Sequence, residues 1–297
     1  MKLAMFTHAG GTRLGVVQGD MIADLATADP ALPPELKRLL ELGPAAMERA
    51  REAAKKARDL LPLSNVRLEA PIDRPNKFIA VGLNYADHVA ETGSDRPEFP
   101  TIFNKQNTCV NRTGGPVHLP RVSPDMLDYE GEMAFVIGRR CRHVPRARAA
   151  EVIAGYCIVN DVSVRDWQLR TPTMTIGKSF DTHGPIGPWL TTADEVGDPH
   201  VLSLRTTVNG EQRQASNTSH LIFNCFQLVE HLSTAFTLEP GDVISTGTPS
   251  GVGLAMKPRC MLKAGDVVRI EIERLGAIEN QIIDEPGDTV SLGALNG

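Results

Sequence analysis

Short β-type runs separated by glycine and proline dominate the chain after about residue 70, and this pattern most constrains the fold. The runs are 78–82, 101–105, 133–138, 156–161, 202–208, 242–246 and 267–273. One convincing amphipathic helix, 221–236, interrupts them. Many short strands joined by long, glycine-rich connections predict an α+β protein with a mixed or antiparallel β architecture, whose loops carry the function.

Residues 1–70 follow a different pattern. Short strands are expected at 2–7, 14–18 and 21–25, and helical segments at 36–42 and 45–61. Few charges and two prolines between residues 63 and 75 place the junction with the main domain near Pro71. We therefore predict a small N-terminal α+β domain, 1–70, followed by a larger domain, 71–297.

Composition argues against several classes of function. The net charge of −5 over 297 residues argues against a broad nucleic-acid surface. The five cysteines are odd in number and form no CxxC pair, so we expect reduced thiols in a cytoplasmic protein. The short apolar start is too short for a signal peptide, and no run of 18 or more apolar residues predicts a membrane span.

The acidic stretch 128–138 contains the strongest candidate site. Side chains alternate between the faces of a strand, so Glu130 and Glu132 share one face, whereas Met133 and Phe135 take the other. Two neighbouring carboxylates repel each other, and burying either one alone is costly. A divalent cation with oxygen ligands would resolve this cost; a solvated strand end is the alternative.

A third carboxylate strengthens the metal interpretation. The run 155–161 has the composition of a buried strand and ends at Asp161. A carboxylate at this strand end can complete a three-carboxylate site for Mg²⁺ or Mn²⁺. Few histidines or cysteines lie near either stretch, which argues against zinc.

Two further positions carry candidate chemistry. His88 and Glu91 follow the 78–82 run and are three residues apart, so they are neighbours in a helix. A carboxylate beside an imidazole suits a general base acting on water, although surface pairs with this spacing are also common. Lys178 lies in a largely uncharged stretch and is either directed at a substrate anion or an ordinary surface lysine.

The loop 246–253, which consists mostly of small residues, is the last candidate. Its hydroxyls and amides could hold a carboxylate, although its glycines alone would also mark a tight turn.

Five stretches together resemble the fumarylacetoacetate hydrolase superfamily, particularly its bacterial, acylpyruvase-like members. They are 81–88, 128–138, 155–168, 177–181 and 241–253, in the family's order, and they span roughly residues 75 to 275. The resemblance implies a catalytic domain of mixed β-sandwich or roll type over 71–297, usually assembled as a homodimer. Many such proteins carry a small N-terminal domain.

The resemblance also implies roles for individual residues. Glu130, Glu132 and Asp161 would hold Mg²⁺ or Mn²⁺, with Asp128 outside the ligand set. His88 and Glu91 would activate water, and Lys178 would stabilise the oxyanion. Other residues match positions that surround the substrate: Lys105, Arg165, Gln168 and Thr248.

The activity implied is hydrolysis of the C–C bond of an acylpyruvate-type 1,3-diketo acid, such as fumarylpyruvate, to pyruvate and a carboxylic acid. Such reactions belong to the breakdown of aromatic compounds. The partner would be this small molecule, with neither nucleic acid nor membrane. An oxaloacetate decarboxylase or a hydroxyheptadienedioate isomerase on the same scaffold is the alternative, because fold and metal site do not separate these reactions. A non-catalytic binding protein is a third possibility.

Overall fold

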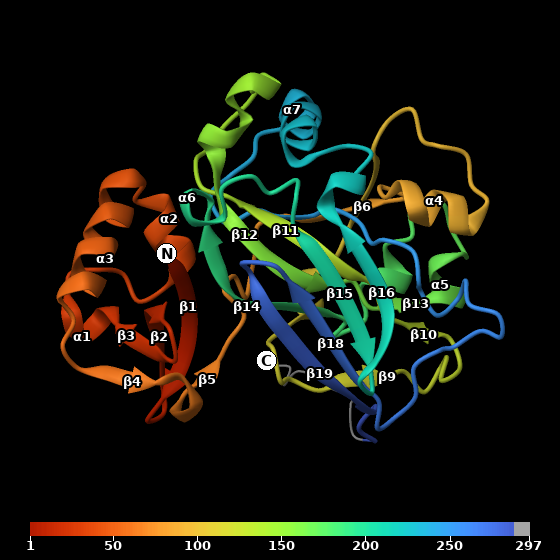
Figure 1. The fold of residues 1–297 in the computed structure, drawn as a ribbon, viewed down its shortest axis with the longest axis horizontal. Coiled ribbons are helices and arrows are strands. Elements are labelled where there is room, and N and C mark those ends of the chain that lie inside the picture. Colours follow the sequence, from red (N-terminus) through yellow and green to blue (C-terminus); the bar gives the residue numbers. More distant parts are fainter. Residues whose placement is uncertain (288–297) are drawn as a thin grey trace, which may run out of the picture.

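The computed structural model describes residues 1–287, and Figure 1 shows their arrangement. The N-terminal part consists of β1 (Lys2–His8), β2 (Gly11–Gln18), β3 (Met21–Asp24), α1 (Leu25–Ala28), α2 (Leu36–Glu41), α3 (Pro44–Lys56), β4 (Leu60–Pro62) and β5 (Arg67–Leu68). The helix expected to reach residue 61 ends at Lys56 instead. Leu60 and Leu61 extend the sheet beside β3, where Ile22 faces Leu61, and Pro62 cannot continue a helix.

One sheet of 12 strands runs through both parts of the chain, in the order β4-β3-β2-β1-β14-β12-β11-β17-β6-β7, with β5 on β1 and β8 on β14. Its remaining members are β6 (Phe78–Gly82), β7 (Thr101–Asn104), β8 (Val110–Asn111), β11 (Gly131–Ile137), β12 (Ile153–Asn160), β14 (Gly184–Thr192) and β17 (Val243–Ser245).

The strand β14 was not expected from the sequence, because Pro185 and Pro188 interrupt its pattern. Proline lacks the amide proton that a central strand donates, and it is tolerated where pairing is irregular. The register between β12 and β14 shifts between Tyr156 and Ile158, which face Thr191 and Gly187. Pro188 lies at this irregularity.

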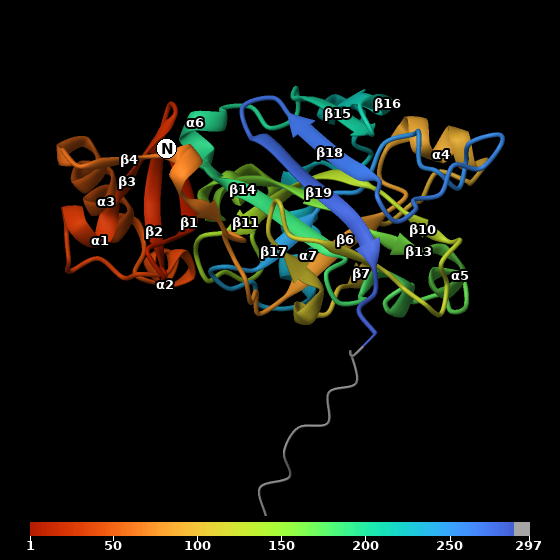
Figure 2. The ribbon, with the colours of Figure 1, turned by 90° about the horizontal axis from the view of Figure 1, so that it is seen from below.

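A second, five-stranded sheet packs on the first, as Figure 2 shows. Its order is β16-β15-β18-β19-β9, with β9 (Val117–Leu119), β15 (Ser203–Val208), β16 (Glu211–Asn217), β18 (Val267–Ile272) and β19 (Gly276–Asp284). The short strands β10 (Leu127–Asp128) and β13 (Ser163–Val164) pair separately. The other helices are α4 (Ala86–Thr92), α5 (Arg165–Gln168), α6 (Ala193–Val196) and α7 (Cys225–Ala235). Short 3-10 helices cover Leu63–Asn65, Asn107–Cys109, Arg146–Val152, Ile176–Lys178 and Thr218–His220.

The alternation expected along β11 is confirmed. Met133 and Phe135 belong to the core between the two sheets, which also contains Ile270. Ala134 and Val136 belong to the cluster on the opposite face. Both faces of this strand are therefore buried, which explains its nearly continuous apolar sequence.

The N-terminal part is joined to the rest by backbone pairing and by packing. In β1, Lys2 and Leu3 face Thr191 and Leu190 of β14. The hydrophobic cluster that contains Leu36 of α2 also contains Val136 of β11 and Val159 of β12. The domain boundary near Pro71 stays a prediction, and residues 288–297 of the predicted larger domain lie outside the described residues.

Candidate metal centre and its pocket

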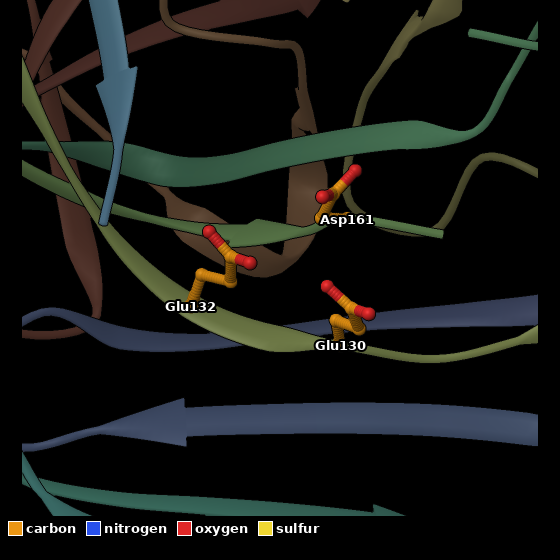
Figure 3. Close-up of side chains that lie close together, drawn as sticks. All are labelled: Glu130, Glu132 and Asp161. Carbon is orange, nitrogen blue, oxygen red and sulfur yellow. The ribbon is translucent and has the colours of Figure 1, made fainter. Parts of the chain in front are cut away.

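Three carboxylates converge at one end of the paired strands β11 and β12, as Figure 3 shows. Glu132 is the second residue of β11, Glu130 directly precedes this strand, and Asp161 directly follows β12. The pairing of Gly131 with Asn160 brings these strand ends together. One oxygen of each carboxylate lies within 4.8 Å of the others, and all three side chains are buried.

Buried cations surround this group. The Lys178 ammonium donates to Glu130 Oε2 at 2.7 Å and to Asp161 Oδ2 at 2.9 Å. Lys105 Nζ donates to Asp161 Oδ1 at 2.6 Å, and Arg165 Nη1 donates to Glu130 Oε1 at 2.6 Å. Hydrogen bonds from charged donors such as these are short and strong, so they fix the orientation of both carboxylates.

Asp128 contributes no oxygen to the three-carboxylate group. Arg165 Nε donates to its Oδ2 at 2.8 Å, and the amides of Gly253 and Leu254 donate at 2.8 and 3.0 Å. The protein itself therefore satisfies this carboxylate, which positions Arg165.

Glu132 differs from its neighbours because no lysine or arginine among the described residues donates to it. Ser245 Oγ and the Gly247 amide donate to its Oε2 at 2.5 and 2.9 Å. Burial and the charges of Asp161 and Glu130 raise the pKa of its carboxyl well above the ordinary value.

The pKa of Glu130 moves the other way. Burial alone would raise this pKa, but the charges of Lys178 and Arg165 outweigh burial and lower the pKa to about 2. Counting Asp128, four buried carboxylates face three buried cations, Lys105, Arg165 and Lys178, so with all four carboxylates ionised one negative charge is left uncompensated. A divalent cation with oxygen ligands fits this excess and this donor set.

The pair expected from helical spacing forms in α4. His88 Nδ1 lies 3.3 Å from Glu91 Oε2, and Glu91 Oε1 accepts from the Gly251 amide at 2.9 Å. Asn84 fixes the approach to this helix, because its buried amide donates to the carbonyls of Phe223 and Thr246. Glu91 is thus anchored at one oxygen and contacts the imidazole with the other.

A pocket of about 780 Å³ brings these groups together. Its polar inner half is lined by His88, Glu91, Glu130, Arg165, Gln168, Lys178 and Thr248. Lys105, which we expected near the substrate, is not among the lining residues. Its ammonium donates to Asp161 and to the carbonyls of Lys178 and His183, so it lies behind the carboxylates and positions Asp161.

The loop 246–253 does hold carboxylates, and they are the protein's own. Its amides at Gly247, Gly251 and Gly253 donate to Glu132, Glu91 and Asp128, respectively. At Gly253 an added Cβ would lie 2.3 Å from the Cys260 carbonyl oxygen and 2.7 Å from Asp128, so only glycine fits. Sequence analysis identified the small residues of this loop but not the side chains that they hold.

Residues 77–283 match the family described as "Fumarylacetoacetate (FAA) hydrolase C-terminal". The chain belongs to the fumarylacetoacetate hydrolase family. It is 43% identical to a mitochondrial oxaloacetate tautomerase of Rattus norvegicus over 288 residues, which cover 95% of this chain and 92% of the relative.

Solved structures give the same family and fold. The maleylpyruvate hydrolase of Sphingobium, in complex with manganese(II) and pyruvate, has a TM-score of 0.81 and is 35% identical over 96% of this chain and all of its own. The 2-hydroxyhepta-2,4-diene-1,7-dioate isomerase of Mycobacterium marinum has a TM-score of 0.76 and is 34% identical over 96% of this chain and 99% of its own.

These comparisons confirm the predicted family and its α+β fold. Its named members are enzymes, and the buried acidic group together with the manganese-bound relative supports a divalent metal. Within residues 1–287, no helix is both long and apolar enough to cross a membrane. The homodimer and the cytoplasmic location stay predictions.

Proposed function

We propose that this protein is a divalent-metal-dependent enzyme that stabilises the enolate of a 2-oxo acid, and that it hydrolyses the C–C bond of acylpyruvate-type substrates. The observation that carries the proposal is the His88–Glu91 pair, which lines the same pocket as Glu130 and Lys178. A base for water and a site for an enolate are the two requirements of this reaction.

The three carboxylates Glu130, Glu132 and Asp161 would hold Mg²⁺ or Mn²⁺. The bound ion would supply Lewis-acid stabilisation of the negative charge that develops on the 2-oxo acid. Lys178 would add a second positive charge beside the substrate oxygens. Gln168 and Thr248 line the pocket and would orient the substrate, and Arg165, held by Asp128, would fix the inner wall.

The hydrolytic step begins with a water molecule beside His88. With Nδ1–H directed at Glu91, the Nε2 atom is free to take a proton from water. The oxygen of that water attacks the acyl carbonyl carbon, and the bond between this carbon and the methylene of the pyruvyl part breaks. Its electron pair becomes the enolate of pyruvate, which takes up the proton from His88, and the acyl part leaves as a carboxylic acid.

Keto–enol tautomerisation of oxaloacetate is the second candidate. The 43% identical rat relative is named for this activity. The reaction passes through the enolate of oxaloacetate, which is also a 2-oxo acid enolate, and it needs no attacking water. The carboxylate group and Lys178 would serve both reactions, whereas hydrolysis alone requires an activated water.

One set of assays tests the proposal. Acylpyruvates, fumarylpyruvate and oxaloacetate should be followed with Mg²⁺ or Mn²⁺ present, measuring pyruvate release and the enol absorbance of oxaloacetate. We expect pyruvate and the carboxylic acid in equal amounts from an acylpyruvate. Enol–keto conversion without acylpyruvate cleavage would favour the second candidate. The absence of both activities would contradict the proposal.

A further inference from the structure

The connection between β11 and β12 concentrates positive charge in a chain whose net charge is −5. Five of the ten residues 139–148 are arginines, all of them exposed, and this stretch contains no acidic residue. Gly131 faces Asn160 at the metal-site end of the two strands, whereas Ile137 faces Ile153 beside the connection. The length of β11 therefore separates this basic stretch from the acidic group by about 20 Å. In Figure 1 it belongs to the yellow-green segment between the N-terminal helices and α7.

The backbone of the basic stretch is fixed to neighbouring elements. Cys141 and Leu238 exchange two hydrogen bonds, at 2.9 and 3.0 Å, and the His143 amide donates to the Ser233 carbonyl at 2.9 Å. Arg142 Nη1 also donates to the Ser233 carbonyl, at 3.0 Å, near the C-terminal end of α7. Because these contacts hold the backbone in place, the loop cannot move its charges apart, and they repel one another.

Two arginines of this stretch are not neutralised by the protein. Arg148 donates to both oxygens of Glu151, at 2.9 and 2.8 Å. The side chains of Arg139 and Arg140, in contrast, form no hydrogen bond or ion pair with any residue of 1–287. The Arg148 guanidinium and, to a smaller extent, the charge of Arg139 hold the pKa of Glu151 below its ordinary value. The one carboxylate near Arg139 is thus already bonded to another arginine.

These cations line a cavity of about 330 Å³. Four arginines face it, at 139, 140, 142 and 148, together with His143 and a single carboxylate, Glu151. A second cavity, of about 280 Å³, adjoins the first, because Arg139 and Val152 line both. Its lining is mostly apolar and comes partly from α2 and α3: Leu40, Pro44, Met47, Val152, Ile153 and Ala154. We name the two cavities together the basic groove.

We propose that the basic groove binds an organic polyphosphate, whose phosphates meet Arg139 and Arg140 and whose apolar part lies against Met47 and Val152. The planar guanidinium matches phosphate oxygens with two parallel hydrogen bonds, and a polyphosphate brings several negative charges into a small space. The cavities have the size of small-molecule sites, whereas macromolecules need a broader surface. Nucleoside diphosphates and coenzyme A share the required chemistry. The basic groove lies apart from the metal pocket, so this inference goes beyond the proposed function and does not depend on it.

Calorimetry with inorganic pyrophosphate, ADP and coenzyme A tests the inference on the full chain. The titrations should be made first with EDTA, because an ion at the acidic group would itself hold phosphate, and then with Mg²⁺ saturating. We expect binding under both conditions, since the arginines need no metal. ADP should bind about fivefold tighter than pyrophosphate, because its adenosine part buries apolar surface. The tighter binder of ADP and coenzyme A indicates the source of the polyphosphate.

Variants assign the contacts. Arg139→Gln, Arg140→Gln should weaken binding of all three ligands by about tenfold. Lys257→Gln, Arg259→Gln is the matched control, because it removes two exposed cations that line the metal pocket instead. This control should bind all three ligands as the wild type does. Met47→Ala should weaken ADP by about fivefold and leave pyrophosphate unchanged. High salt should weaken all three ligands.

Several results would overturn the inference. If neither ADP nor coenzyme A binds, or if they bind only with Mg²⁺, the basic groove is not a polyphosphate site. Equal losses in the control and in Arg139→Gln, Arg140→Gln would place the ligand in the metal pocket instead. If Met47→Ala weakens pyrophosphate as much as ADP, the position assigned to the apolar part is wrong. Melting temperatures of the variants near that of the wild type show that each loss reflects binding and not unfolding.

Discussion

The inner and outer halves of the pocket are built in opposite ways. The inner half takes its carboxylates from the ends of β11 and β12, and Glu130 and Asp161 are each held by two buried cations. The outer half is lined mainly by loops, among them 254–259, and within residues 1–287 the side chains of Lys257 and Arg259 on that loop have no bonded partner. Rigid, fully bonded groups suit charge stabilisation, whereas loops can vary between relatives. We infer that the inner half sets the chemistry and the outer half selects the substrate.

Removing one ligand of the inner half should have the largest effect. Glu132→Gln should reduce activity to the background rate and abolish the thermal stabilisation that metal produces. The metal-free variant should fold as stably as the wild type, because an amide resembles the protonated carboxyl that the raised pKa favours. Calorimetry with Mn²⁺ measures the loss of metal binding, and thermal melts with and without Mn²⁺ measure the stability of each state. Glu151→Gln, at an exposed carboxylate paired with Arg148, should change nothing. Metal-dependent activity in Glu132→Gln would contradict the assigned site.

Removing the general base His88 of α4 should have the second-largest effect on activity. His88→Ala should lower kcat/KM for acylpyruvate hydrolysis by about 10²–10⁴-fold, the usual contribution of a positioned general base. Any turnover of oxaloacetate should fall less, because it needs no attacking water. Glu91→Gln should act in the same direction but more weakly, since Glu91 orients the imidazole. Equal losses on both substrates would assign His88 to a step that the two reactions share.

Metal binding should depend on pH through Glu132. Its ordinary pKa is 4.5, and burial and the charges of Asp161 and Glu130 raise it in the fold. Above pH 4.5 the metal-free folded state then binds more protons than the unfolded chain, so its free energy of unfolding falls as pH rises toward the raised pKa. A bound metal displaces this proton, so metal affinity should rise by up to about tenfold per pH unit in that window.

Calorimetry in buffers of different ionisation enthalpy measures this exchange directly. We expect release of about one proton for each ion bound. Metal binding without proton release would mean that Glu132 is already ionised in the metal-free protein.

Replacing Lys178 should change the metal affinity less than loss of a carboxylate ligand, and in the opposite direction. Its ammonium bridges Glu130 and Asp161, so it competes with a bound cation for the same carboxylates. Lys178→Met should tighten Mn²⁺ binding by about tenfold while impairing catalysis, and it should destabilise the metal-free protein. The measurements are the dissociation constant of Mn²⁺ and the melting temperature without metal. Lys263→Met is the control, because Lys263 is exposed and does not line the pocket. Weaker Mn²⁺ binding would show that Lys178 mainly positions the ligands.

The smallest effect should come from the attachment of α4, the helix that carries His88 and Glu91. Ser216 Oγ donates to Asp87 Oδ2 at 2.8 Å and ties α4 to β16. Ser216→Ala removes one partly buried hydrogen bond, worth about 1 kcal/mol, so kcat/KM should fall by roughly fivefold. Metal affinity should stay as in the wild type, because the carboxylates do not contact this bond. A change in metal affinity would show that the position of α4 and the metal site are coupled.

Local spacing was enough to predict the centre of the site. The period of two along β11 places Glu130 and Glu132 together, and the helical spacing of three places Glu91 beside His88. The composition of the run 155–161 added Asp161, and the uncharged stretch around Lys178 singled out that lysine; the family resemblance then implied a role for each. In the structure His88, Glu91, Glu130 and Lys178 line one pocket, and Glu132 and Asp161 lie beside Glu130 in the acidic group. Such features depend on residues that are close in sequence or on motifs that the family shares, so the sequence alone contains them.

Tertiary structure decided what surrounds that centre. The hydrogen bonds from Lys178 to Glu130, from Ser245 to Glu132 and from Gly253 to Asp128 join residues 48, 113 and 125 positions apart. The same holds for the pairing of β1 with β14, which carries one sheet through both parts of the chain. No local periodicity encodes contacts of this range, because they arise only when strands from distant segments bury their apolar faces together.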